Sequence, residues 1–132
     1  MGRQIGFDTV GGKKPIEGTI WKLTDVELVE WKKEADHDLH LVVKDKGGPA
    51  SELIDVEFPD TGCQGTISSP MKTRIGAARN ALLTACGSKP TSNYKPVSGE
   101  ATIEGIGFFD KSHGAPSTIE LHPALSFSGS CH

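Results

Sequence analysis

The chain has 132 residues, of which 36% are hydrophobic and 23% are charged, and its formal net charge is -3. This length and composition indicate one folded, soluble domain rather than a disordered tail. A general nucleic-acid binder needs a basic excess to neutralise phosphates, and this acidic chain lacks one. Its apolar runs are also too short to cross a bilayer. We therefore expect neither nucleic acid nor a membrane among its partners.

Residues 1–17 show little pattern and are predicted to form an N-terminal arm ahead of a single domain at residues 18–132. The first residues contain no apolar core of a signal peptide. The chain as written is therefore expected to be cytoplasmic. It would be exported or periplasmic if a signal peptide had been removed.

The segment at residues 18–31 is predicted to form a long first strand with a bend. Trp21 and Leu23 share one parity, whereas Val26 and Leu28 share the other. Because successive side chains of a strand point to opposite faces, this change of parity indicates a β-bulge.

Alternating apolar residues predict a second strand at 36–45 and a third at 53–58. Ser69 and Pro70 are typical of a helix start, and Gly87 is typical of a helix end. A polar loop at 88–98 is followed by two last strands, predicted at 101–109 and 118–127.

This order predicts a mainly β fold: a five-stranded OB-like Greek-key barrel of the oligonucleotide/oligosaccharide-binding type, with one α-helix between strands three and four. The apolar positions expected in its core are Leu41, Val56, Leu82, Ile106 and Leu121.

The three cysteines are Cys63, Cys86 and Cys131, and none forms a C-x-x-C motif, which excludes a zinc ribbon or a thioredoxin motif. Cys63 precedes the predicted helix and Cys86 ends it. A bridge between these two and unbridged buried thiols are both open interpretations.

The last third of the chain contains GIGFFD at 105–110, HG at 113–114 and IELHP at 119–123. These strings resemble an uncharacterised family of small bacterial, often exported, proteins that end in GVGFFD…HG…IELHPVL. The sequences at 38–42 and 57–60 are also similar to that family, and the resemblance covers roughly residues 18–127. Here the loop after the HG is shorter, and no signal peptide is expected in the chain as written. The resemblance supports the fold but implies no activity.

In an OB-like barrel the strand order is 1-2-3-5-4, so that strands two, three and five are neighbours. Strands lie about 4.8 Å apart, and next-but-one residues roughly 6–7 Å apart. Six histidine and carboxylate side chains are therefore expected in one outer patch, with His113 on the loop leading into it. They are Asp38, His40, Asp55, Glu57, Glu120 and His122.

Imidazole and carboxylate groups bind zinc and similar ions, and they also transfer protons. The cofactor is left open, with a divalent metal such as zinc as the candidate. The simplest interpretation is a solvated sheet face, in which these pairs contribute little. The candidate metal ligands are Asp38, His40, Glu57, Glu120 and His122, and the candidate catalytic residues are His40, Glu120 and His122.

Two classes of function follow from this patch. The first is a module that binds a small ligand or a protein partner. The alternative is a small metal-dependent or acid–base enzyme, hydrolase-like, using the patch on strands two, three and five.

Aromatic residues such as Trp21, Trp31 and Tyr94 are expected mostly in the core. Arg74 and Arg79 on the helix are interpreted as a solvated flank or an anion site.

Overall fold

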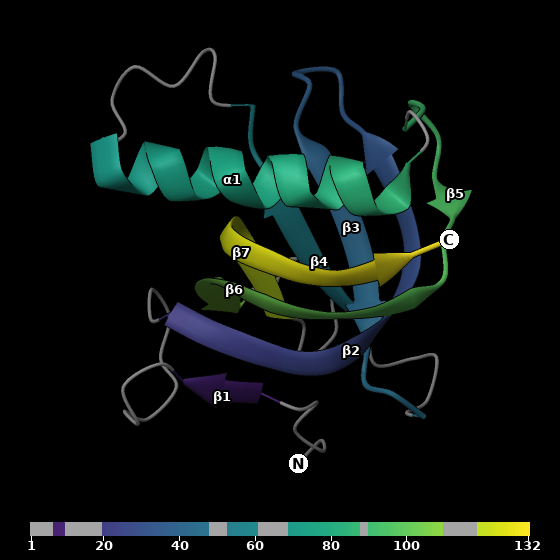
Figure 1. Ribbon diagram of the computed structural model, residues 1–132, viewed down its shortest axis with the longest axis horizontal. Helices are drawn as coiled ribbons and strands as arrows, with labels where there is room; N and C mark the ends of the chain where they lie inside the picture. Colours follow the sequence, from purple (N-terminus) through teal and green to yellow (C-terminus); the bar gives the residue numbers. More distant parts are fainter. Residues whose placement is uncertain (1–6, 10–19, 48–52, 61–68, 88–89, 110–118) are drawn as a thin grey trace.

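A closed sheet forms the centre of the protein, as a computed structural model shows for residues 7–9, 20–47, 53–60, 69–87, 90–109 and 119–132 (Figure 1). Eight elements follow one another along these residues. They are β1 (Phe7–Thr9), β2 (Ile20–Lys33), β3 (Leu39–Lys44), β4 (Leu53–Phe58), α1 (Ser69–Cys86), β5 (Lys95–Pro96), β6 (Gly99–Phe109) and β7 (Ile119–Cys131).

The barrel has five strands in the order β2-β3-β4-β7-β6, and β6 pairs back with β2 to close it. All of these pairings are antiparallel except the one between β4 and β7, which is parallel. The helix α1 packs mainly on β7 and also contacts β4 (Figure 1). This confirms the predicted barrel, its strand order and the place of its helix.

The first barrel strand, β2, contains the predicted bulge. Its register against β6 shifts between Leu23 and Val26, and Asp25 between them has a positive φ of 52°. The extra residue turns the strand so that both Leu23 and Val26 are fully buried. The first half of β2 can therefore pair with β6, and its second half with β3.

Two short strands lie where the sequence predicts no regular structure. Within the predicted arm, β1 pairs with β2 beside Trp21 and Leu23. Within the predicted loop at 88–98, β5 pairs with β2 at Glu30 and Trp31. Both are too short to show a periodic pattern, and both depend on β2 for their hydrogen bonds.

Most of the predicted core is confirmed, because Leu41, Val56, Leu82 and Leu121 are all fully buried. Ile106 is only half-buried, so that prediction was wrong. Gly107, its neighbour on β6, lies on the inner side instead, and the Trp21 ring occupies the space that a side chain there would need. The bulky indole of β2 therefore leaves room only for glycine on this part of β6.

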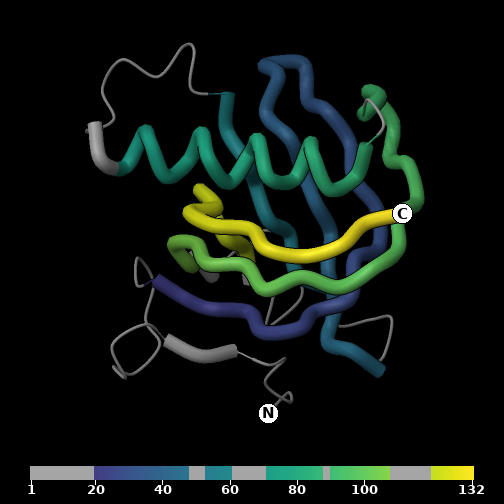
Figure 2. Tube along the Cα trace, in the orientation of Figure 1, coloured from purple at the N-terminus to yellow at the C-terminus, as the bar shows by residue number. Residues whose placement is uncertain are grey.

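A disulfide joins Cys86, at the end of α1, to Cys131, at the end of β7, with their Cα atoms 4.6 Å apart. Both alternatives considered for Cys86, a bridge to Cys63 and a free buried thiol, were wrong. The reason is that β7 continues past the predicted end at 127 to Cys131. The end of this strand lies beside the last turn of α1 (Figure 2). Cys63 itself lies outside the described residues.

Over the described part of the chain, no helix combines the length and the apolar character needed to cross a membrane.

Replacing Leu121 with Ala should lower the free energy of unfolding by about 2–5 kcal/mol, because the truncation leaves a cavity in the core. Denaturant unfolding measures this loss. Ser128→Ala, an exposed position on the same strand, is the control and should change stability by less than about 0.5 kcal/mol. A Leu121→Ala loss as small as that of the control would contradict the burial of Leu121.

Replacing Cys131 with Ser should lower the free energy of unfolding by about 2–4 kcal/mol under oxidising conditions, because the disulfide closes a long loop. In the wild type, reduction should expose two further thiols to a thiol reagent. Cys63→Ser retains both bridged cysteines and should show the same gain of two thiols. If reduction of the Cys63→Ser variant exposes no further thiols, Cys63 takes part in the bridge.

Candidate functional site

The outer face of three neighbouring strands contains the predicted histidines and carboxylates. In the ladder between β3 and β4, His40 pairs with Glu57. In the parallel ladder between β4 and β7, Asp55 pairs with Glu120. Because the alternate residues of these strands point into the core, the polar residues share the other face. The six predicted side chains therefore lie in one region.

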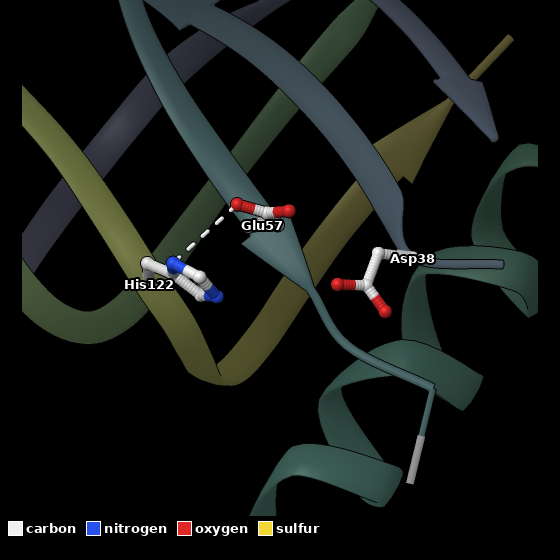
Figure 3. Close-up of side chains that lie close together, drawn as sticks. All are labelled: Asp38, Glu57 and His122. Atoms are coloured by element: carbon white, nitrogen blue, oxygen red, sulfur yellow. Dashed lines mark ion pairs between the residues drawn. The ribbon is translucent and has the colours of Figure 1, made fainter. Parts of the chain in front are cut away.

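Three of them converge closely enough to hold one ion. Asp38, Glu57 and His122 each offer a ligand atom, and these atoms all lie within 4.8 Å of one another. Figure 3 shows that they come from three separate places: the turn before β3, the end of β4, and β7. The Nδ1 atom of His122 lies 3.5 Å from Oε2 of Glu57. We call these three residues the triad.

Asp38 is the most deeply buried member of the triad, with 9% of its surface exposed. Its Oδ1 accepts a hydrogen bond of 3.0 Å from the backbone N–H of Asp60. Its own backbone N–H donates to Oδ1 of Asp36. These bonds fix the carboxylate at the point where the β2–β3 turn meets the chain leaving β4.

Glu120 lies beside the triad, with Oε1 3.8 Å from Nδ1 of His122. The side chain of His122 is 44% exposed, whereas those of Glu57 and Glu120 are 16% and 21% exposed. The triad is therefore open to solvent on the side of His122 and closed on the side of Asp38.

His40 lies next to the triad but pairs with carboxylates outside it. Its Nδ1 is 3.1 Å from Oε1 of Glu34, and its Nε2 is 3.6 Å from Oδ1 of Asp55. The second distance is longer than a hydrogen bond, so Asp55 is an ion-pair partner. With a carboxylate at each ring nitrogen, His40 belongs to a second group of charges rather than to the triad.

This second group also includes Lys32 and Tyr94. The ammonium of Lys32 is 3.5 Å from Oε2 of Glu34 and 4.7 Å from the centre of the Tyr94 ring. The Tyr94 ring lies 6.1 Å from the ring of His40. Tyr94 is 40% exposed, whereas Trp21 and Trp31 are buried in the core as expected.

Carboxylates raise the pKa of His40 from its usual 6.5 to about 9. Asp55 beside Nε2 makes the largest contribution, burial of the ring opposes it, and Glu34 and Glu57 add to it. Burial and the nearby charges of Asp55, Glu30, Glu34 and Glu57 raise the pKa of Tyr94 to about 12.

The pKa of Glu57 is also raised. Burial is the main cause, and the charges of Asp38 and Glu120 add to it, whereas His122 and His40 act against it. Glu57 is therefore the carboxylate at which the two groups of charges meet.

Sequence reasoning did not identify Glu34 or Asp60 as part of this region. Glu34 lies in the β2–β3 turn, and Asp60 contributes only a backbone N–H, so strand alternation gives no signal for either. His113, which was predicted on the loop leading into the patch, lies outside the described residues.

Comparison of the chain with protein-family models, with curated proteins and with solved structures gave no match. The function of the site is therefore inferred from its own residues and their geometry.

In protein treated with a chelator, the imidazole of His40 should titrate near pH 9, as NMR of its ring signals can measure. Since this folded-state pKa exceeds the unfolded value, His40 stabilises the fold fully below about pH 6.5, and this contribution is lost as the pH rises through 9. The difference in melting temperature between the wild type and His40→Gln should shrink over that range. A difference that stays constant from pH 6 to pH 10 would contradict the ion pairs of His40.

Proposed function

We propose that this protein is a metal-binding barrel domain that holds one divalent ion, such as zinc, at Asp38, Glu57 and His122. The observation that carries the proposal is the convergence of three ligand atoms from three elements within 4.8 Å. Neighbouring strands provide Glu57 and His122, and the turn preceding β3 provides Asp38. The buried carboxylate of Asp38 distinguishes this group from a solvated sheet face, whose polar groups are exposed.

The distance between two of the ligand atoms suits a first-row transition metal. Zinc binds imidazole nitrogen and carboxylate oxygen at about 2.0–2.2 Å, which places neighbouring ligands of a tetrahedral site about 3.4 Å apart. The distance between His122 and Glu57, 3.5 Å, already has this length. The Asp38 ligand atom lies within 4.8 Å of those of Glu57 and His122, and binding would draw the three closer together.

The charge and the donor types favour the same class of ion. Two carboxylates and a neutral imidazole carry two negative charges, which a divalent ion balances. Calcium and magnesium prefer shells built from oxygen alone, whereas an imidazole ligand favours zinc, copper, iron or nickel. Asp38 is 9% exposed, and pairing with a cation offsets the cost of burying its charge.

Hydrolysis is the second candidate function, because three protein ligands converge among the described residues. Structural zinc sites use four protein ligands, whereas catalytic sites use three and keep a position open. The exposed side of His122 is where a substrate would approach. A bound ion would supply Lewis-acid chemistry there. Glu120, beside His122 and outside the triad, is placed to exchange a proton.

The disulfide between Cys86 and Cys131 supports a place of action in an oxidising compartment. Disulfides persist outside the cytosol and are rare within it. We infer that the protein works after export, and this agrees with a metal site exposed to extracellular or periplasmic zinc.

Titration of the metal-free wild type with zinc, followed by calorimetry, should show one ion bound per chain. His122→Ala should weaken binding about 100-fold or more, since even groups outside the ligand shell contribute 10- to 100-fold. His132→Ala is the matched control: His132 is an exposed histidine that follows β7 and lies outside the triad. Its affinity should equal that of the wild type. Equal losses in both variants, or no binding by the wild type, would refute the site.

A further inference from the structure

We propose that Arg79 of α1 is a positioning residue for this cation site, holding Glu57 and Asp38 in place without contacting the ion. The inference rests on the proposed metal binding and adds a part of the fold that lies outside the ligand set. It gives the helix a role in setting the affinity of the site.

The first contact joins the helix to the strand that carries Glu57. Nη1 of Arg79 donates a hydrogen bond of 3.0 Å to the backbone carbonyl of Phe58. Phe58 is the last residue of β4 and follows Glu57 directly. Its side chain is fully buried and packs edge-on against Phe127 of β7. The guanidinium therefore fixes the end of the strand from which Glu57 projects.

The second contact joins the same stretch of chain to Asp38. The backbone N–H of Asp60 donates a hydrogen bond of 3.0 Å to Oδ1 of Asp38. Only Pro59 separates Asp60 from Phe58, and the proline ring restricts the backbone there. Phe58, Pro59 and Asp60 thus connect the helix to Asp38. Arg79 holds the carbonyl of Phe58 at one end, and the N–H of Asp60 bonds Asp38 at the other.

The helix is a rigid support for this arrangement. Its inner face, with Ile75, Ala78 and Leu82, is buried, and the disulfide at Cys86 fixes its last turn to β7. Arg79 follows the buried Ala78 and is itself half-buried. A guanidinium on a fixed helix loses little freedom in making its bond, so it can hold the Phe58 carbonyl in one place.

Arg74 provides a comparison on the same helix. Its side chain is 45% exposed, and its Nη2 lies 3.3 Å from Oε1 of Glu104 on β6. That strand carries no member of the triad. Replacing Arg74 removes an arginine and one polar contact from α1 without touching the chain between Phe58 and Asp60.

The test measures zinc affinity and the visible absorption of bound Co²⁺ for the wild type and for Arg79→Met, Arg79→Lys and Arg74→Met. Arg79→Met should weaken zinc binding about tenfold, in the range found for groups that orient metal ligands. It should also alter the Co²⁺ spectrum, because the ligand geometry changes. Arg79→Lys retains one donor and should recover part of both signals. Arg74→Met should stay within about twofold of the wild type.

Two results would overturn the role of Arg79: an Arg79→Met variant with wild-type affinity and spectrum, or equal losses in Arg79→Met and Arg74→Met. Circular dichroism checks that each variant folds, and Arg79→Lys carries the comparison if Arg79→Met does not fold. If the wild type binds neither Zn²⁺ nor Co²⁺, the cation site itself is refuted. If the wild type and Arg79→Met bind zinc equally well, the cation site stands and only the role of Arg79 is refuted.

Discussion

In the ladder between β4 and β7, Asp55 pairs with Glu120 and Val56 with Leu121, and the two strands run parallel. This ladder brings together β4 and β7, which are separated in the sequence by the helix and by β6. Without it the sheet would remain open between β4 and β7, and Glu57 and His122 would lie on unconnected strands. Because side chains alternate, a slip of one residue would turn Leu121 outward and His122 inward. The burial of Leu121 thus specifies the register that places His122 in the site.

The helix and the disulfide stabilise the ladder between β4 and β7. α1 packs along β7, and the bridge between Cys86 and Cys131 ties its last turn to the end of the same strand. Arg79 links the helix to β4 through the carbonyl of Phe58. Both strands of the parallel ladder are therefore attached to one rigid element. By our proposal, the geometry of the outer patch depends on these contacts as well.

The charges of the outer patch separate into two groups with different chemistry. His40 lies between Glu34 and Asp55, and Lys32 also pairs with Glu34, so that these charges balance one another. Among the described residues the triad has no comparable balance, because two carboxylates face one imidazole that is partly exposed. A bound cation would balance the negative charge of the triad. The same sheet face in this way holds an ion-pair network and, by our proposal, a cation site.

Local patterns in the sequence were enough to predict the elements and their order. The third strand was predicted at residues 53–58, where the structure has β4, and the helix starts and ends close to its capping residues. The change of parity between Leu23 and Val26 located the bulge. These features depend on neighbouring residues and on the alternation of strand side chains, and both are readable along the chain.

The outer patch was predictable as a region because it needs only strand order and alternation. Its division into two groups was not, because Glu34 comes from a turn and Asp60 contributes a backbone group. Three features join residues far apart in the chain: the disulfide between Cys86 and Cys131, the packing of Trp21 against Gly107, and the contact of Arg79 with Phe58. The sequence by itself determined the elements and the face on which the polar residues lie. Only the tertiary structure decided which of them meet, because distances across the barrel are set by packing and register rather than by local pattern.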